Sequence, residues 1–441
     1  STPTEIIKLR TFDALIKQQE PSGNFVILNI TEDDIEKEGG WPLPRKRLAD
    51  IQLEILGKGA IGTGWAVSFP QPDRLMGDED FARSLGYGPS VIAMFEDGNG
   101  NYPEFKGTVV KGEDLGGIIS PGVKQNFYKL RENTLEGLAV APTEVDQLVR
   151  RIPLLVRTPD NSWIPSFATQ IYKALFNVKT YIITTNDNGI QEISIRGIPP
   201  VKTDSMGRKY ISWVKTPETT LQEMDVNGRF VIIGVTANGV MPQLATPVGL
   251  LEPHKIQAAL AESILIQDSP TVPDWSLAAE ITILLISVAL TWLVLHWFGI
   301  SLGIGMAVFI MLVTGFGGYY MIQTGLLVDV TWTLISQFIT GSTAFYLRFR
   351  EQYKLRQLIK QQFGKYLDPR MVKKLQNNPE LCQINGARVN CSIIFTDLRG
   401  FTSLSESVEP EMVTYIMNNV LDVQVKAVNK FYGCTDKFIG D

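Results

Sequence analysis

The sequence predicts an α/β domain, then a three-helix transmembrane segment, then the start of an α+β domain. Three observations support this division. Strand-like and helix-like segments alternate through residues 1–272. No Lys or Arg occurs between Lys255 and Arg348, although the 441 residues include 41 of them. After that gap, an apolar run ends in Asp397 and a tight turn. The formal net charge of −5 gives no indication of a nucleic-acid partner.

The first domain is expected to form a sheet with helices packed on it. "GKGAIG" (57–62) fits a dinucleotide-binding pattern, but it closes a helix and opens a strand, so it predicts a helix cap instead. Asp33, Asp34, residues 69–74 and His254 are candidate ligand contacts at strand ends, although such residues more often form turns or surface positions. The predicted strands are 24–30, 60–69, 91–95, 152–158 and 229–235, and the predicted helices are 45–59, 164–176 and 253–265.

Three stretches of this domain resemble the second class of CHASE sensor domains, which are extracytoplasmic modules of bacterial receptors. They are "FVILNITEDDIEKEGGWPLPRKRLADIQLEILGKGAIGTGWAVSFPQPDR", "LLVRTPDNSWIPSFA" and "GRFVIIGVTANGVMPQLATPVG". The resemblance implies an extracytoplasmic ligand or partner, whose identity the sequence does not supply. In this family an acidic residue is usual within the second strand, where this chain has Gly64 and Trp65. A ligand contact inherited at that point is therefore in doubt.

Three apolar stretches, 276–298, 300–323 and 325–347, each approach the roughly 20 residues that span a bilayer. Their short joints predict sequential antiparallel neighbours in contact with membrane lipid. Nine basic and two acidic residues between Arg348 and Lys374 mark the cytoplasmic side. We therefore expect a multi-pass protein of a bacterial plasma (inner) membrane, with residues 1–272 extracytoplasmic and 348–441 cytoplasmic. No signal peptide is visible, so an export segment upstream of residue 1 is expected.

Two acidic residues, Glu280 and Asp329, lie near the outer ends of the first and third stretches. We interpret them as interfacial carboxylates rather than as a buried relay.

A helical linker is expected at 348–380. Leu355, Ile359, Gln362 or Phe363, and Tyr366 recur at three- and four-residue steps, which suits pairing with the same helix of a second chain. The alternative is a basic helix resting on anionic lipid, and both can hold.

Residues 388–441 contain the candidate chemistry. A buried strand, 392–396, is expected to deliver Asp397 to a turn whose backbone N–H groups cradle an anion. A helix, 410–431, then returns the chain to a neighbouring strand, "GCTDKFIG", with Asp441 at its tip. Two aspartates on adjacent strands beside a phosphate-binding turn predict a two-metal phosphoryl-transfer site.

"FTDLRGFTSLSE" (395–406) and "DKFIGD" (436–441) resemble the class III nucleotide cyclases. The resemblance implies an α+β, ferredoxin-like catalytic domain in a homodimer formed through the linker and the catalytic domain. It assigns two Mg²⁺ or Mn²⁺ ions per active site to Asp397 and Asp441, with the Leu398 carbonyl assisting. Gly400, Phe401 and Thr402 would supply backbone contacts to the triphosphate. The implied reaction converts ATP to 3′,5′-cyclic AMP and pyrophosphate.

Lys437 lies at the position that reads the purine edge in this family. Because Lys only donates hydrogen bonds, it favours adenine, whose N1 accepts, over guanine, whose N1–H donates. The expected function is therefore a receptor adenylate cyclase. A guanylate cyclase, or a non-catalytic sensor or adaptor with a cyclase remnant, is the alternative. The family's transition-state arginine and ribose-positioning asparagine are expected beyond residue 441, so we expect the 441-residue chain alone to be inactive.

Overall fold

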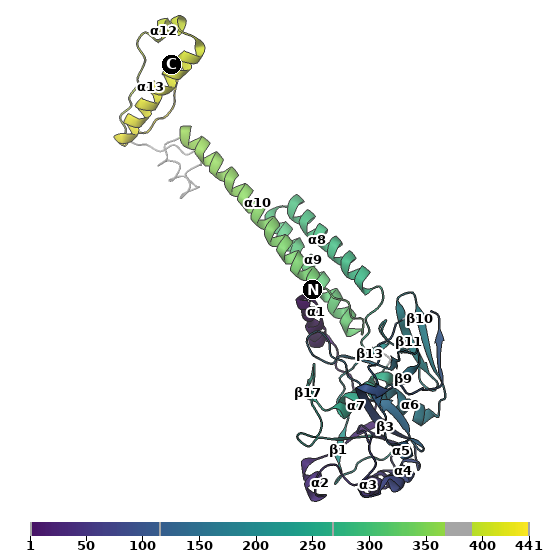
Figure 1. Cartoon of the computed structure of the whole chain (residues 1–441). Helices are drawn as coiled ribbons and strands as arrows, with labels where there is room; N and C mark the ends of the chain where they lie inside the picture. The colour runs from purple at the N-terminus through teal and green to yellow at the C-terminus, as the bar shows by residue number, and fades with distance from the viewer. Residues whose placement is uncertain (1, 114–115, 267–268, 367–389, 440–441) are drawn as a thin grey trace. The chain divides into compact units, whose positions relative to one another are not determined.

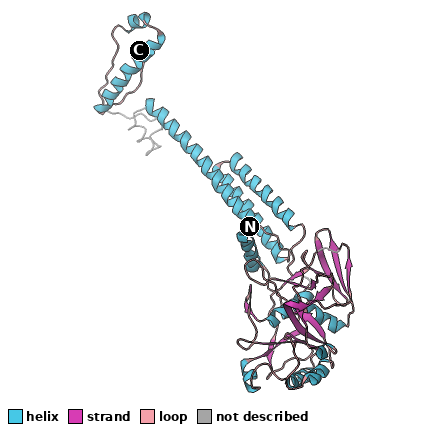
Figure 2. Ribbon diagram, in the orientation of Figure 1, coloured by secondary structure: helices cyan, strands magenta, loops and turns pink. Residues whose placement is uncertain are grey.

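The computed structural model describes residues 2–113, 116–266, 269–366 and 390–439. They belong to two compact units, Ser1–Gly341 and Ser342–Asp441. Every strand that the described residues form belongs to the first unit (Figure 2). The alternation of strands and helices expected for the first domain is therefore confirmed.

A mainly parallel seven-stranded sheet forms the centre of the first unit. Its order is β14-β1-β15-β2-β3-β5, and β6 also pairs with β3. β1, β15, β2 and β3 run parallel, and the residues of β1, β15 and β2 are all buried. Burial on both faces explains why β1 reads as the unbroken run "FVILNI". The strands are β14 (Glu218–Thr220), β1 (Phe25–Ile30), β15 (Phe230–Val235), β2 (Gly62–Trp65), β3 (Ser90–Asn101), β5 (Val123–Lys124) and β6 (Leu135–Leu138).

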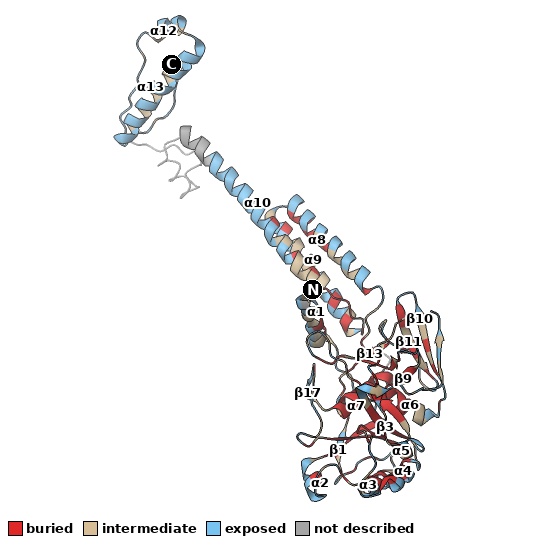
Figure 3. Ribbon diagram, in the orientation of Figure 1, coloured by how far each residue is buried: buried red, intermediate tan, exposed pale blue. Residues whose placement is uncertain are grey.

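Helices cover both faces of this sheet, each over its own apolar core (Figure 3). The core on one face joins the sheet to α3 (Arg45–Gly57) and α4 (Asp78–Leu85). The core on the other face joins it to α6 (Phe167–Phe176) and α7 (Pro253–Leu265). Connections that leave β1 and β15 therefore reach opposite faces, as in a doubly wound fold.

The predicted helix 164–176 begins late, at Phe167. Residues Trp163–Pro165 form the short strand β9 instead, and the Ser166 side chain accepts a hydrogen bond from Thr169 N–H, which caps α6. The predicted helix cap at "GKGAIG" is confirmed, because Gly59 takes a left-handed backbone (φ +89°) directly after α3.

The remaining elements of the first unit surround the main sheet. They are a four-stranded sheet, two short strand pairs besides the pair made with β9, and three helices. The four-stranded sheet contains β12 (Val201–Lys202), β11 (Gly189–Ile195), β10 (Tyr181–Asn186) and β4 (Thr108–Lys111). The strand pairs are β13 (Arg208–Tyr210) with β7 (Arg151–Pro153), β16 (Leu244–Thr246) with β17 (Gly249–Leu251), and β8 (Leu155–Arg157) with β9. The helices are α1 (Thr2–Leu15), α2 (Glu32–Lys37) and α5 (Tyr128–Arg131).

Two helices of the described residues are long and apolar enough to cross a membrane: α8 (Ser276–Trp297) and α9 (Ile300–Gln323). Only 17% and 6% of their most apolar stretches are buried within the chain, so they differ from the core helices of soluble proteins. Much of both helices is exposed (Figure 3), and many of their exposed side chains are large and apolar, as a lipid-facing helix requires.

The third predicted stretch, 325–347, differs from the structure at its start. α10 (Thr331–Tyr366) begins six residues late, because the chain before it is extended and pairs with Thr271. Leu327 N–H donates to the Thr271 carbonyl over 2.9 Å, and the Asp329 carboxylate accepts Thr331 N–H over 2.8 Å at the helix start. Unlike α8 and α9, α10 is not among the described helices that are long and apolar enough to cross a membrane.

α10 continues as one helix through the first part of the predicted linker. Leu355 and Ile359 are 59% and 44% exposed, so both side chains are available to a partner or a lipid surface. Residues 367–380 of the predicted linker lie outside the described residues, and the side chains of Gln362, Phe363 and Tyr366 are not described.

Candidate functional site

The turn after Asp397 is a tight turn that opens a short helix. Phe401 N–H donates to the Leu398 carbonyl over 3.3 Å, which closes a four-residue turn. Its third residue, Gly400, has φ +82° and ψ +16°, the left-handed geometry of a type II turn that favours glycine. α12 (Phe401–Ser407) starts immediately after it, so Phe401 and Thr402 open a helix. The turn therefore follows from "DLRG" itself.

The segment before this turn contradicts the prediction of a buried strand at 392–396. Ile393, Ile394 and Phe395 are 74%, 83% and 87% exposed, and the segment pairs with no strand of the described residues. A strand gains most of its stability from hydrogen-bonded neighbours, and the predicted neighbour, 433–439, is not a strand either. The helix between them is confirmed as α13 (Pro410–Lys430), and α12 contacts it.

The predicted site residues are only partly brought together. Asp397 is exposed and makes no hydrogen bond or ion pair to Lys437 among the described residues. Lys437 is also exposed, and its amine lies 3.4 Å from the Asp436 carboxylate. Asp441 lies outside the described residues. Within the described ranges, no group of three or more His, Cys, Asp or Glu side chains is arranged to hold a metal ion.

The donors present nevertheless suit a magnesium-type ion. Asp397 offers an exposed carboxylate, and hard cations prefer oxygen ligands. The Leu398 carbonyl already accepts one hydrogen bond, from Phe401, and keeps a second lone pair for a ligand. Gly400, Phe401 and Thr402 lie at the turn and the first positions of α12. These residues fit the oxygen-rich half of a metal-phosphate site.

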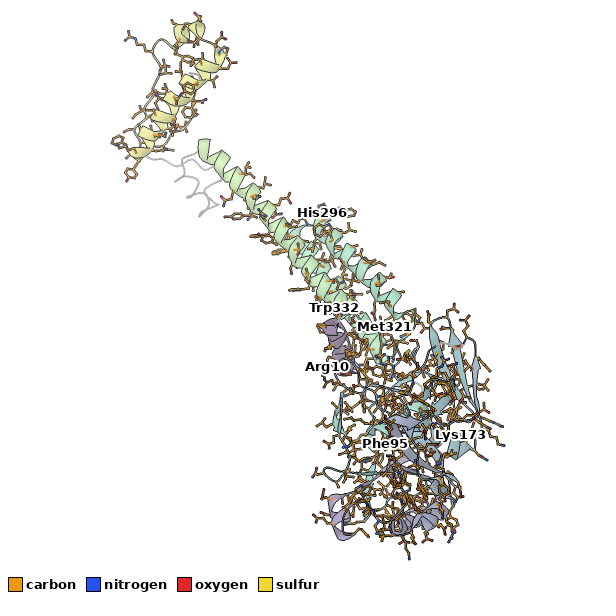
Figure 4. The ribbon with its side chains drawn as sticks, in the orientation of Figure 1. Arg10, Phe95, Lys173, His296, Met321 and Trp332 are labelled. Atoms are coloured by element: carbon orange, nitrogen blue, oxygen red, sulfur yellow. The ribbon has the colours of Figure 1, made fainter. Side chains whose placement is uncertain are left out.

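A second candidate site is a pocket of about 490 Å³ in the first unit. It lies at the carboxyl edge of the parallel strands, where ligands bind in doubly wound folds. Val67 to Gln71 follow β2, Phe95 lies in β3, and Val240 to Pro242 follow β15. The "WPL" segment and the start of α3 close one side, and Pro253, the first residue of α7, closes another. Figure 4 labels Phe95 within this part of the unit.

Arg45 is the charged residue among those that line this pocket. Its side chain is 11% exposed, and its guanidinium carbon lies 4.2 Å from the centre of the Phe69 ring. Arg45 Nε lies 3.5 Å from Asp78 Oδ1, too far for a good hydrogen bond. Burial lowers the pKa of Arg45 from its usual value, and the charges of Asp78 and Asp73 oppose that shift.

Of the residues that the sequence suggested as ligand contacts at strand ends, some line the pocket and others do not. Phe69, Pro70 and Gln71 of the 69–74 stretch line the pocket. Asp34 instead caps α2, because its carboxylate accepts Thr31 N–H over 2.9 Å while its own N–H donates to the Thr31 hydroxyl. Asp33 is exposed in the first turn of α2.

His254 is a buried structural residue. It is 1% exposed, and its Nε2 lies 2.9 Å from Asn29 Oδ1. Asn29 Nδ2 donates to Glu218, so Asn29 Oδ1 accepts and His254 Nε2 carries the proton. Burial lowers the pKa of His254 to about 4, so the ring is neutral at pH 7. The pocket residues after β15 lie in the third stretch that resembles the sensor family, but Val, Met and Pro gave no sign of a ligand contact.

Glu280 and Asp329 both have hydrogen-bond partners, and their interpretation as interfacial carboxylates stays a prediction. Glu280 Oε1 accepts hydrogen bonds from the Lys8 amine over 2.7 Å and from Asp329 N–H over 2.9 Å. Asp329 is 5% exposed. One carboxylate of α8 therefore holds both α1 and the residue that caps α10. Trp332, labelled in Figure 4, lines a pocket of about 550 Å³ at this junction together with Lys8 and Glu280.

α1 is also fixed to the sheet side of the unit. Arg150 is fully buried and binds the Asp13 carboxylate through both Nε and Nη2, at 2.8 and 2.7 Å. Its remaining donors bind Asp146 at 2.7 and 2.8 Å. These bonds raise the pKa of Arg150 above its usual value against the effect of burial. α1 thus connects the sheet domain to the first apolar helix.

The α/β domain, its carboxyl-edge pocket and the apolar helices that follow define a membrane-associated sensor. The CHASE2 domain family model matches residues 1–295, and the chain belongs to this family of extracellular sensor domains. A 50-residue stretch is 42% identical to an adenylate cyclase of Anabaena cylindrica. That stretch is 11% of this chain and 10% of the relative, so the chain spans about a tenth of the relative's length. No solved structure matches the chain.

Proposed function

We propose that the chain is the sensor, membrane and initial catalytic part of a receptor adenylate cyclase of the bacterial inner membrane. The observation that carries the proposal is the order of parts. A CHASE2 sensor is followed by apolar helices and then by "FTDLRGFTSLSE", where Asp397 precedes a type II turn. The similarity to the Anabaena cylindrica adenylate cyclase supports the same activity. Residues 1–272 would sense, and 348–441 would respond in the cytoplasm.

The membrane part of the proposal has three passes. α8 and α9 supply two, and the apolar first half of α10 supplies the third. Gln337 Nε2 of α10 donates to the Thr314 hydroxyl of α9 over 3.1 Å, which suits packed neighbouring helices. The basic residues from Arg348 onward favour a cytoplasmic end for α10.

In the catalytic part, Asp397, Asp441 and the Leu398 carbonyl would hold two Mg²⁺ or Mn²⁺ ions. When bound, these ions would polarise the ribose 3′-hydroxyl and neutralise the departing pyrophosphate. Gly400, Phe401 and Thr402 would position the triphosphate through backbone N–H groups. Lys437 would donate to adenine N1, and the domain would act as a homodimer.

The test expresses the natural open reading frame in bacterial membranes and measures cyclisation of ATP and GTP with Mn²⁺. We expect cyclic AMP from the wild type and at least a hundredfold loss in Asp397→Ala. Asp422→Ala is the matched control, since Asp422 is an exposed carboxylate of α13 that pairs with Lys426. Equal loss in both variants would contradict the assigned role of Asp397.

The base assignment has its own test in the same membranes. Lys437→Glu replaces a donor with an acceptor, so we expect the ratio of ATP to GTP turnover to fall at least tenfold, or about 1.4 kcal/mol. Lys430→Glu, at the end of α13, should leave that ratio unchanged. Cyclic GMP as the wild-type product would establish the guanylate cyclase instead.

A non-catalytic sensor or adaptor is the second candidate. The exposure of residues 392–396 favours this candidate, because the described residues 390–439 form no sheet. No product from either nucleotide, with folded and dimeric protein, would establish this candidate.

A further inference from the structure

We propose that the carboxyl-edge pocket of the CHASE2 domain binds a small, mainly apolar, uncharged molecule through a hydrogen-bond acceptor, such as a carbonyl oxygen, held by Arg45. The proposal deepens the sensor role proposed above by assigning its site and the chemical class of its ligand. It concerns binding alone, so it can be tested without any cyclase activity.

The size and the walls of the pocket point to a small organic ligand. Its volume of about 490 Å³ falls in the range of roughly 300–1,000 Å³ that small-molecule sites occupy. Of the fifteen residues that line it, Arg45, Ser68 and Gln71 are polar, and aromatic rings come from Trp41, Phe69 and Phe95. Walls of this kind favour the burial of an apolar body with few polar groups.

The position of the pocket also favours binding. Parallel strands β2 and β15 end at this edge, and the helices that follow β1 and β15 leave on opposite faces. Such a switch point leaves a crevice that the backbone itself does not fill.

Arg45 supplies the specific contact. A guanidinium has five N–H donors, and the partner that Arg45 has for them among the described residues is Asp78, whose Oδ1 lies 3.5 Å from Nε. Its contacts are the Phe69 ring at 4.2 Å and Asp78 Oδ1 at 3.5 Å. Asp78 cannot accept from all five donors, so a ligand oxygen in the pocket would give the remaining ones an acceptor.

The charges around Arg45 favour a neutral ligand over an anion. Asp78 and Asp73 both interact electrostatically with Arg45, and Asp73 also accepts the backbone N–H of Arg45 over 3.2 Å. Two carboxylates thus already surround one guanidinium. A further carboxylate would meet their repulsion in a poorly hydrated site, whereas a carbonyl oxygen would not.

A ligand here would touch the element that leads to the membrane. Pro253 lines the pocket and is the first residue of α7, and α8 begins at Ser276, eleven residues after α7 ends at Leu265. Movement of α7 on binding would therefore reach the first apolar helix through a short connection.

The experiment uses the full chain in lipid nanodiscs and three ring probes of similar size. Acetophenone carries a carbonyl, toluene carries no acceptor, and benzoate carries a charge. Equilibrium dialysis measures saturable binding, with empty nanodiscs correcting for partition into lipid. We expect acetophenone to bind at least tenfold more tightly than toluene or benzoate. Arg45→Met should weaken acetophenone at least tenfold and leave toluene unchanged.

Two further variants keep the test decisive. Arg47→Met is the matched control, because Arg47 lies two residues along α3, pairs with Glu38 at 2.7 Å and does not line the pocket. Met241→Trp fills the pocket from the loop after β15 and should abolish acetophenone binding even if Arg45→Met fails to fold. Tighter binding of benzoate, equal binding of toluene, or no saturable binding of any probe would overturn the proposal. None of these results would alter the cyclase assay, so the two proposals fail separately.

Discussion

At the residue scale, single side chains fix how the central sheet meets its helices. Gly234 of β15 lies against the ring of His254 at the start of α7, and a Cβ atom there would clash with that ring. His254 is in turn bound to Asn29 of β1. One glycine therefore permits the contact between two strands and α7.

This contact predicts a large cost for one added methyl group. Gly234→Ala should lower the free energy of unfolding by about 1–3 kcal/mol, because the ring must shift within a packed core. Gly57→Ala is the control, since a Cβ at Gly57 meets nothing within 4 Å. Thermal unfolding followed by circular dichroism measures both, and a similar midpoint for the two variants would disprove the tight packing at Gly234.

His254 predicts a pH dependence of stability. Its pKa is about 4 when folded and about 6.5 when unfolded, so the unfolded chain binds the extra proton between these values. Stability should fall as the pH drops from about 6.5 toward 4, by roughly 3 kcal/mol at most. Glu252 and Lys255, the charged neighbours of the ring, have smaller effects than burial. Urea unfolding of wild type and His254→Gln should show a flatter profile in the variant; parallel profiles would exclude this origin.

At the element scale, α1 is the connection between the sheet domain and the apolar helices. Its Asp13 binds the buried Arg150, and its Lys8 binds Glu280 of α8. Glu280 also accepts the N–H of Asp329, which caps α10. The hydrophobic pattern predicted α8 and α9, but it could not show that α1 contacts them, because partners separated by 272 residues leave no local signal.

The Lys8–Glu280 pair should therefore show measurable coupling. In a double-mutant cycle of Lys8→Met and Glu280→Gln in nanodiscs, we expect a coupling free energy of about 1.5–3 kcal/mol, because charged hydrogen bonds in partly buried sites are strong. The more exposed Lys129–Glu79 pair, with side chains 35% and 71% exposed, should show no measurable coupling. Thermal unfolding midpoints supply both values, and equal coupling in the two pairs would refute a special role for Glu280.

Elements were predicted well where the signal was local. The strands at 24–30, 91–95 and 229–235 and the helix at 253–265 follow from apolar runs, periodicity and caps, and all four are present. The strand at 392–396 was wrong for the described residues, since an apolar run becomes a strand only beside a partner. Helix α10 started late because Leu326 forms a bridge with Thr271, and Gly325 and Leu327 are hydrogen-bonded to Thr271.

At the scale of the whole molecule, the order of parts determines the expected topology. In the proposed topology, a CHASE2 domain outside, three passes and a cytoplasmic response domain would place residues 272 and 348 on opposite sides of the membrane. The charge distribution agrees, because basic residues gather directly after the third stretch.

Reporter fusions test this topology directly. Alkaline phosphatase should be active after residue 272 and after 324, and green fluorescent protein should fluoresce after 299 and after 350. The alternation follows from three crossings with a cytoplasmic end. Phosphatase activity after residue 350 would indicate an even number of passes beyond residue 272 and would remove the cytoplasmic catalytic assignment.

The sequence by itself determined most strands and helices, the two apolar helices, and the turn at "DLRG". These depend on neighbours within a few residues, which periodicity, caps and glycine geometry report. Only the tertiary structure decided the insertion of β15 between β1 and β2, the pocket with Arg45 at the sheet edge, and the attachment of α1 through Glu280. Each of these joins residues far apart in the chain, where contact depends on how whole elements pack.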